Sequence, residues 1–80
     1  DDPVGEILAE LHQGLTGVTQ AEVRRRLARI ESLARSLGAS GKLYGHVADD
    51  AMALKYAHQR YSAYLSWLEW ESASSVGASP

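Results

Sequence analysis

Apolar residues recur along most of the chain at the three-to-four-residue spacing that is typical of helices packed on one side. In the first such segment, DDPVGEILAELHQ, Asp2 is placed to cap a helix and Pro3 suits its first turn. Gly14 follows the segment, and glycine is a common residue at the C-terminal end of a helix. The pattern predicts a first helix over residues 3–13.

The second segment, TQAEVRRRLARIESLARSLG, has signals for both of its ends. Thr19 and Glu22 have the spacing of a capping box, in which each side chain bonds a backbone N–H of the other residue. Gly38 follows the last apolar position and predicts the end of the helix. We therefore expect a second helix over residues 20–37.

The third helix is expected to be long, over residues 45–72, because no glycine or proline interrupts residues 46–76. The small polar residues that follow predict a disordered tail over residues 73–80. No segment shows the two-residue alternation of a strand, so the predicted fold class is all-α. We expect a single domain over residues 1–72, a small three-helix up-down-up bundle with a long C-terminal helix. The residues predicted to build its core are Val4, Ile7, Leu8, Leu11, Val23, Leu27, Ile30, Leu33, Val47, Leu54, Tyr61 and Leu65.

The third helix is apolar on opposite sides, which is typical of a helix that is covered on both. One side carries a heptad-like seam that suits the core. The residues predicted to anchor a partner are Met52, Tyr56, Tyr64, Trp67 and Trp70. If a short loop aligns the second and third helices, residues from about 64 onward extend beyond the other helices, and this extension carries Tyr64, Trp67 and Trp70. In the alternative, the helix ends near Ala63 and folds back, so that the tryptophans cap the core.

Composition and charge narrow the function classes. The net charge of −2 does not favour a general nucleic-acid binder, and the absence of cysteine excludes a disulfide framework. No apolar run is long enough to span a membrane and no signal peptide is visible, so we expect a cytoplasmic protein with no membrane partner. We predict no catalytic, cofactor or metal site and no enzymatic activity. His46 and Asp50 lie one turn apart, but two ligands do not make a structural zinc site.

Arginines concentrate on the second helix. Arg24, Arg25 and Arg29 are candidate phosphate contacts, which would suit a nucleic-acid-binding module. The other interpretation is that this basic face pairs with acidic residues of the first helix, among them Glu6 and Glu10.

The segments VGEILAELHQGL and VRRRLARIESLARSLG resemble the paired short helices of C-terminal docking segments in modular polyketide synthases. The resemblance covers residues 4–38, and VADDAMALKYAH lacks the acidic docking helix that such segments carry next. It is an analogy about architecture: paired short helices that dimerise, followed by a helix that docks a partner.

The function predicted from the sequence is a non-catalytic protein–protein interaction module for assembly, docking or oligomerisation. It would bind a protein partner or form a homo-oligomer through the aromatic residues of the third helix. A nucleic-acid-binding helical module and a small structural subunit of a larger particle remain as alternatives.

Overall fold

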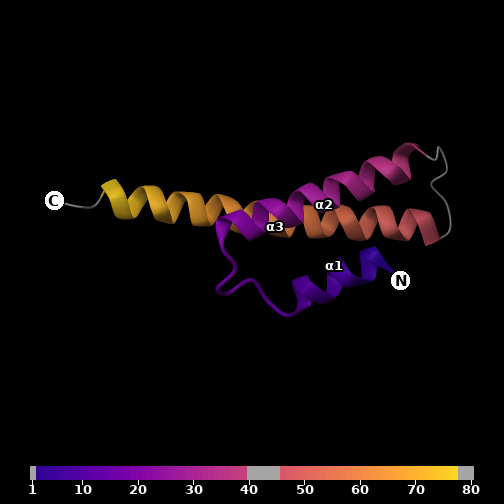
Figure 1. The fold of residues 1–80 in the computed structure, drawn as a ribbon, viewed down its shortest axis with the longest axis horizontal. Coiled ribbons are helices and arrows are strands. Elements are labelled where there is room, and N and C mark those ends of the chain that lie inside the picture. Colours follow the sequence, from indigo (N-terminus) through magenta and orange to yellow (C-terminus); the bar gives the residue numbers. More distant parts are fainter. Residues whose placement is uncertain (1, 40–45, 78–80) are drawn as a thin grey trace.

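The structure is a computed structural model that describes the backbone of residues 2–39 and 46–77. It contains the helices α1 (Pro3–His12), α2 (Gln20–Ala39) and α3 (His46–Gly77), and the described residues include no strand. The helices run up, down and up, with α2 antiparallel to α3 and α1 lying beside them (Figure 1). The predicted all-α three-helix fold is confirmed.

The first helix begins and ends close to the predicted positions. Asp2 has an extended backbone, and its carbonyl accepts the N–H of Glu6 at 2.9 Å, but its side chain makes no capping bond. Gly14 has a φ of +99°, which an L residue rarely adopts, and its N–H donates to the carbonyl of Leu11. The helix therefore ends at His12, where the chain turns through this glycine.

The second helix forms half of the predicted capping box. The backbone N–H of Glu22 donates to the Thr19 hydroxyl at 3.2 Å, but the Glu22 carboxylate bonds arginines instead of returning to Thr19. At its other end the helix continues through Gly38 to Ala39, two residues beyond the predicted end. Gly38 is not one of the glycines with positive φ, so it does not form the left-handed turn that ends many helices.

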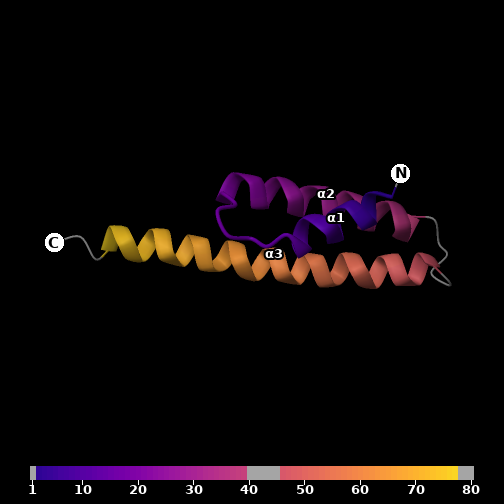
Figure 2. The same ribbon diagram turned by 90° about the horizontal axis from the view of Figure 1, so that it is seen from below.

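The third helix is the longest element, with 32 residues and a length of about 48 Å. It is one continuous helix, so the chain does not fold back near Ala63 (Figure 2). Residues 73–77 are helical rather than part of a disordered tail, because no glycine or proline interrupts the helix before Gly77. Residues 78–80 of the predicted tail lie outside the described residues.

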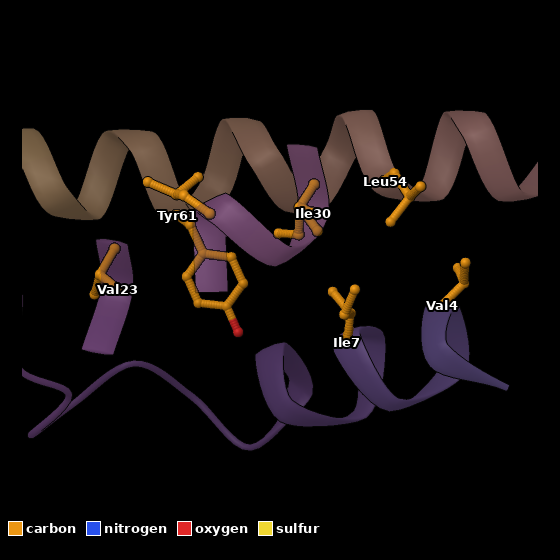
Figure 3. Packing of buried hydrophobic residues seen from close by; sticks show 8 residues of the cluster. Val4, Ile7, Val23, Ile30, Leu54 and Tyr61 are labelled. Carbon is orange, nitrogen blue, oxygen red and sulfur yellow. The ribbon is translucent and has the colours of Figure 1, made fainter. Parts of the chain in front are cut away.

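The core lies where the three helices meet (Figure 3). Its buried side chains are Val4, Ile7, Val23, Leu27, Ile30, Leu54, Ala57 and Tyr61. Four other predicted core residues, Leu8, Leu11, Leu33 and Leu65, are partly buried against it. The side chain of Val47 lies outside the described residues. Ala57 was not predicted. Because it precedes the α2-facing seam by about 60° around the helix, it reaches the side that α1 approaches.

The alignment of α2 with α3 differs from the prediction. Gln20 donates its amide to the Leu68 carbonyl at 3.4 Å, and Arg24 pairs with Glu69 at 2.8 Å. The side chains at the start of α2 therefore reach residues 68–69 of α3, and the C-terminal end of α3 extends past α2 (Figures 1 and 2). The extension therefore begins further along α3 than the predicted position near residue 64, because Leu65 and Leu68 still pack against the core. Packing and polar contacts between the helices set the alignment, whereas the prediction used loop length alone.

Candidate functional site

One side of α3 carries large apolar side chains that the rest of the chain leaves exposed. The exposed fractions are 72% for Met52, 54% for Tyr56, 48% for Trp67 and 65% for Trp70. At 100° per residue these four positions fall within about 60° of one another around the helix axis. We call these four residues the aromatic face.

The aromatic face is exposed because α1 and α2 approach α3 from other directions. Leu54 and Tyr61 are buried within the core and point away from the aromatic face. Ala53, Ala57 and Tyr64 lie between these two sides and pack in or against the core. Two neighbouring helices cover only part of the circumference of a helix, so the remaining side stays open.

Tyr64 belongs to the boundary between the core and the aromatic face. The sequence predicted it as a partner anchor, but its side chain is partly buried against the core. Its ring stacks on that of Trp67, with centroids 5.9 Å apart and planes inclined by 24°. Tyr64 therefore supports Trp67 from the side of the core, and its remaining exposed edge continues the surface.

The arginine face of α2 is matched by carboxylates. Arg24 pairs with Glu69, and Arg25 with Glu22. Arg29 lies 2.8 Å from a carboxylate oxygen of Glu6 and 3.9 Å from one of Glu10, as the acidic first helix predicted. All three candidate phosphate contacts thus face carboxylates of their own chain. Phosphate binding would compete with these pairs, so the structure adds no support to the nucleic-acid alternative.

Arg26 has a structural role that the sequence analysis missed. Its Nη1 donates to the Tyr61 hydroxyl at 3.2 Å, and its guanidinium carbon lies 5.8 Å from the centre of that ring. Its Nε donates to Glu22 at 2.8 Å. The four-residue spacing from Glu22 was a visible signal for the ion pair. The contact with Tyr61 was not, because it joins two helices.

Glu22 has the most strongly shifted acid–base equilibrium among the described groups. Hydrogen bonds from Arg25, and then from Arg26, lower the pKa of its carboxyl from 4.5 to about 2. The lowered pKa keeps Glu22 ionised near neutral pH, where it joins two adjacent arginines at the start of α2. This cluster orients Arg26 towards Tyr61 and supports the fold.

Two grooves lie beside α3 in the part of the chain that the structure describes. One of about 510 Å³ borders the aromatic face and is lined by Leu8, Leu11, His12, Gly14, Tyr56 and Arg60. A second, of about 590 Å³, lies between α2 and α3 on the opposite side of α3, above Ile30 and Leu54. The residues that line each groove come from two helices, so no pattern along the sequence could reveal them.

The described residues contain no group of three or more histidine, aspartate or glutamate side chains placed to hold a metal ion, and the side chain of His46 lies outside them. Within that same part of the chain, no helix combines the length and apolar character needed to cross a membrane. Comparison with protein-family models, with curated proteins and with solved structures finds no match to this chain. A functional assignment therefore depends on the geometry described above.

Proposed function

We propose that this chain is a non-catalytic protein–protein interaction module and that the aromatic face of α3 is its binding surface. The observation that carries the proposal is the exposure of Met52, Tyr56, Trp67 and Trp70 on one side of a helix that already packs against two others. Exposed apolar patches of this kind mark interaction sites, and tryptophan and tyrosine are enriched among the residues that dominate binding energy.

The way in which the aromatic face is presented supports the same function. Its side chains stand on one continuous helix, so a partner meets them without ordering a loop. Tyr64 stacks on Trp67 and restricts the orientation of that ring. A partner helix laid along this side of α3 would bury all four residues, since they recur at helical spacing.

The test is the double substitution Trp67→Ala plus Trp70→Ala. Alanine favours helix, so we expect the helical circular dichroism signal to persist while association is lost. Truncation of an interface tryptophan costs about 2 kcal/mol or more of binding energy. The matched control is Ser32→Ala plus Ser36→Ala, at two exposed positions one turn apart on α2, which should leave association unchanged.

Sedimentation velocity over a dilution series at low and high salt measures the association. Where the chain associates with itself, the proposal expects high salt to leave the association largely intact, because apolar contacts are not screened. Unfolding of the double variant would contradict it, since the rings would then serve the fold of their own chain. Association that disappears at high salt and persists in the double variant would favour the arginine face instead.

A further inference from the structure

Three charged residues, Asp49, Arg60 and Glu71, recur every eleven residues along one edge of the aromatic face, and the last two lie beside its tryptophans. Arg60 and Glu71 are eleven residues apart on α3, which is three turns, so they point in nearly the same direction about 16 Å from each other. Neither forms an ion pair with any residue that the structure describes. They are too far apart to pair with each other within one chain, but both lie on the same edge of the aromatic face.

We infer that the C-terminal part of the aromatic face, which carries Trp67 and Trp70, binds a second copy of this chain, with the two α3 helices antiparallel. The inference rests on the proposed function and names its partner. A two-fold axis that passes beside α3 at the level of residues 65–66, perpendicular to the helix, lies midway between Arg60 and Glu71. This axis places the edge that carries Arg60 and Glu71 in one helix next to the same edge of the other helix. Arg60 of each chain then lies beside Glu71 of the other. In this dimer Arg60 and Glu71 of both chains each have a partner of opposite charge.

A parallel pair of helices would leave these charges unsatisfied. Its two-fold axis runs along the helices and brings the edge that carries Arg60 against the opposite edge of the partner helix. That opposite edge carries Lys55, Gln59 and Ser66, none of which is acidic. Arg60 would then approach another cation and Glu71 would have no partner, a pattern that opposes association. The charges therefore select the antiparallel arrangement.

The shape of the surface fits the same arrangement. Around the two-fold axis, Trp67 and Trp70 of one chain lie alongside residues 61–64 of the other. Ala63 is the member of that stretch that points along the aromatic face, and it is exposed and small, which leaves room for an indole ring. The groove of about 510 Å³ is lined in part by Arg60, so there is space beside this side chain. Large side chains thus face small ones, as close packing between helices requires.

The test uses single charge reversals on the full chain. Arg60→Glu places two glutamates at each contact of its own homodimer, and Glu71→Arg places two arginines there. Each variant alone should dimerise at least about tenfold more weakly than the unaltered chain, as expected for like charges at an interface. Both substitutions keep good helix formers, so the helical signal should not change.

An equimolar mixture of the two variants is the decisive sample. In the mixed dimer the introduced glutamate of one chain meets the introduced arginine of the other, and the unaltered Glu71 of the first chain meets the unaltered Arg60 of the second. Both contacts again pair opposite charges, so sedimentation velocity should show the dimer restored. The control is Lys55→Glu, the same charge reversal on the other edge of α3, which should neither weaken the homodimer nor complement Glu71→Arg.

Two results would overturn the inference. One is a mixture that stays as weakly associated as its separate components, and the other is an unaltered chain that remains monomeric throughout the dilution series. Neither contradicts the proposed function by itself, because the aromatic face would then serve another partner or another register. The proposed function fails separately, when Trp67→Ala plus Trp70→Ala unfolds the chain.

Discussion

Tyr61 and Trp67 lie six residues apart on the same helix but differ in their exposure to solvent. Tyr61 is fully buried between the helices, with its hydroxyl bonded to Arg26, whereas nearly half of the Trp67 surface is exposed. Both are large aromatic side chains, so hydrophobicity does not explain the difference. It follows from direction: Tyr61 points into the core (Figure 3), whereas Trp67 lies about 120° further around the helix, on a side that stays exposed.

The two sides of α3 also differ in their polar contacts. On the covered side Arg26 and Tyr61 satisfy each other, and no buried side-chain nitrogen or oxygen in the described part of the chain lacks a partner. On the open side Arg60 and Glu71 have no ion-pair partner among those residues. The covered side is thus complete within one chain, and the open side has the features of half an interface.

The largest expected effect separates these two aromatic residues. Tyr61→Ala should remove a fully buried ring and cost about 3–5 kcal/mol, as do other large-to-small changes in cores. A domain of this size has only about 4–12 kcal/mol of stability, so the variant should be largely unfolded or close to it. Trp67→Ala, measured as a monomer, should cost only about 1 kcal/mol, mostly the stack on Tyr64. Urea unfolding followed by circular dichroism measures both, and equal losses would refute the contrast.

A smaller effect should distinguish two alanines of α3. Ala57 is fully buried between the helices, so Ala57→Leu should force them apart and cost about 1–3 kcal/mol. Ala63→Leu makes the same change on the exposed side and should alter monomer stability by less than about 0.5 kcal/mol. Thermal unfolding at low protein concentration compares them. If Ala57→Leu were harmless, α1 would not approach α3 as closely as the structure shows.

The next effect in size compares the stability lost when either of two arginines that bond the same carboxylate is replaced. Arg26→Met leaves the Tyr61 hydroxyl without its donor and should cost about 1–2 kcal/mol, as expected for a buried group that loses its partner. Arg25→Met removes only an exposed pair with Glu22, which solvent screens, so its effect should be clearly smaller. Chemical unfolding of both variants gives the comparison. A larger loss for Arg25→Met would mean that the start of α2, rather than the contact with Tyr61, depends on this cluster.

The sequence predicted the elements well because their signals are local. Pro3, Gly14 and Thr19 each act within one turn of the chain, and all three lie at helix ends in the structure. Most of the buried residues followed from helical spacing for the same reason, with Ala57 as the exception. Gly38 shows the limit of a local signal, since α2 continues through it to Ala39.

The relative placement of the helices could not be predicted in this way. Loop length placed residue 64 at the start of the extension, but the side chains of Gln20 and Arg24 reach α3 as far along as Glu69. The importance of Ala57 and Arg26, and the groove beside Tyr56, also depend on that placement. The helical wheel did identify the exposed rings, because direction around one helix is again a local property.

The smallest expected effect is the pH dependence of stability that Glu22 contributes. Folding lowers the pKa of the Glu22 carboxyl from 4.5 to about 2 through its bonds to Arg25 and Arg26. A carboxyl whose pKa is lowered by folding contributes its full stabilisation above the unfolded pKa and loses it as the pH falls through the folded value. The contribution of Glu22 should therefore decline between about pH 4.5 and about pH 2. In Glu22→Gln this part of the acid destabilisation should be absent, so the stabilities of the two proteins, measured by urea unfolding at each pH, should converge as the pH falls.

Glu71→Gln is the matched control, measured at a dilution where the chain is monomeric. Glu71 has no ion pair within the described residues, so its replacement should leave the stability of the monomer nearly unchanged. At concentrations where the chain associates, the same variant should instead weaken the dimer, because it removes one charge from each contact with Arg60 of the other chain. The two carboxylates would then have different roles: Glu22 stabilises the fold of one chain, and Glu71 stabilises the contact between two chains. An effect of Glu71→Gln on the monomer as large as that of Glu22→Gln would contradict this division.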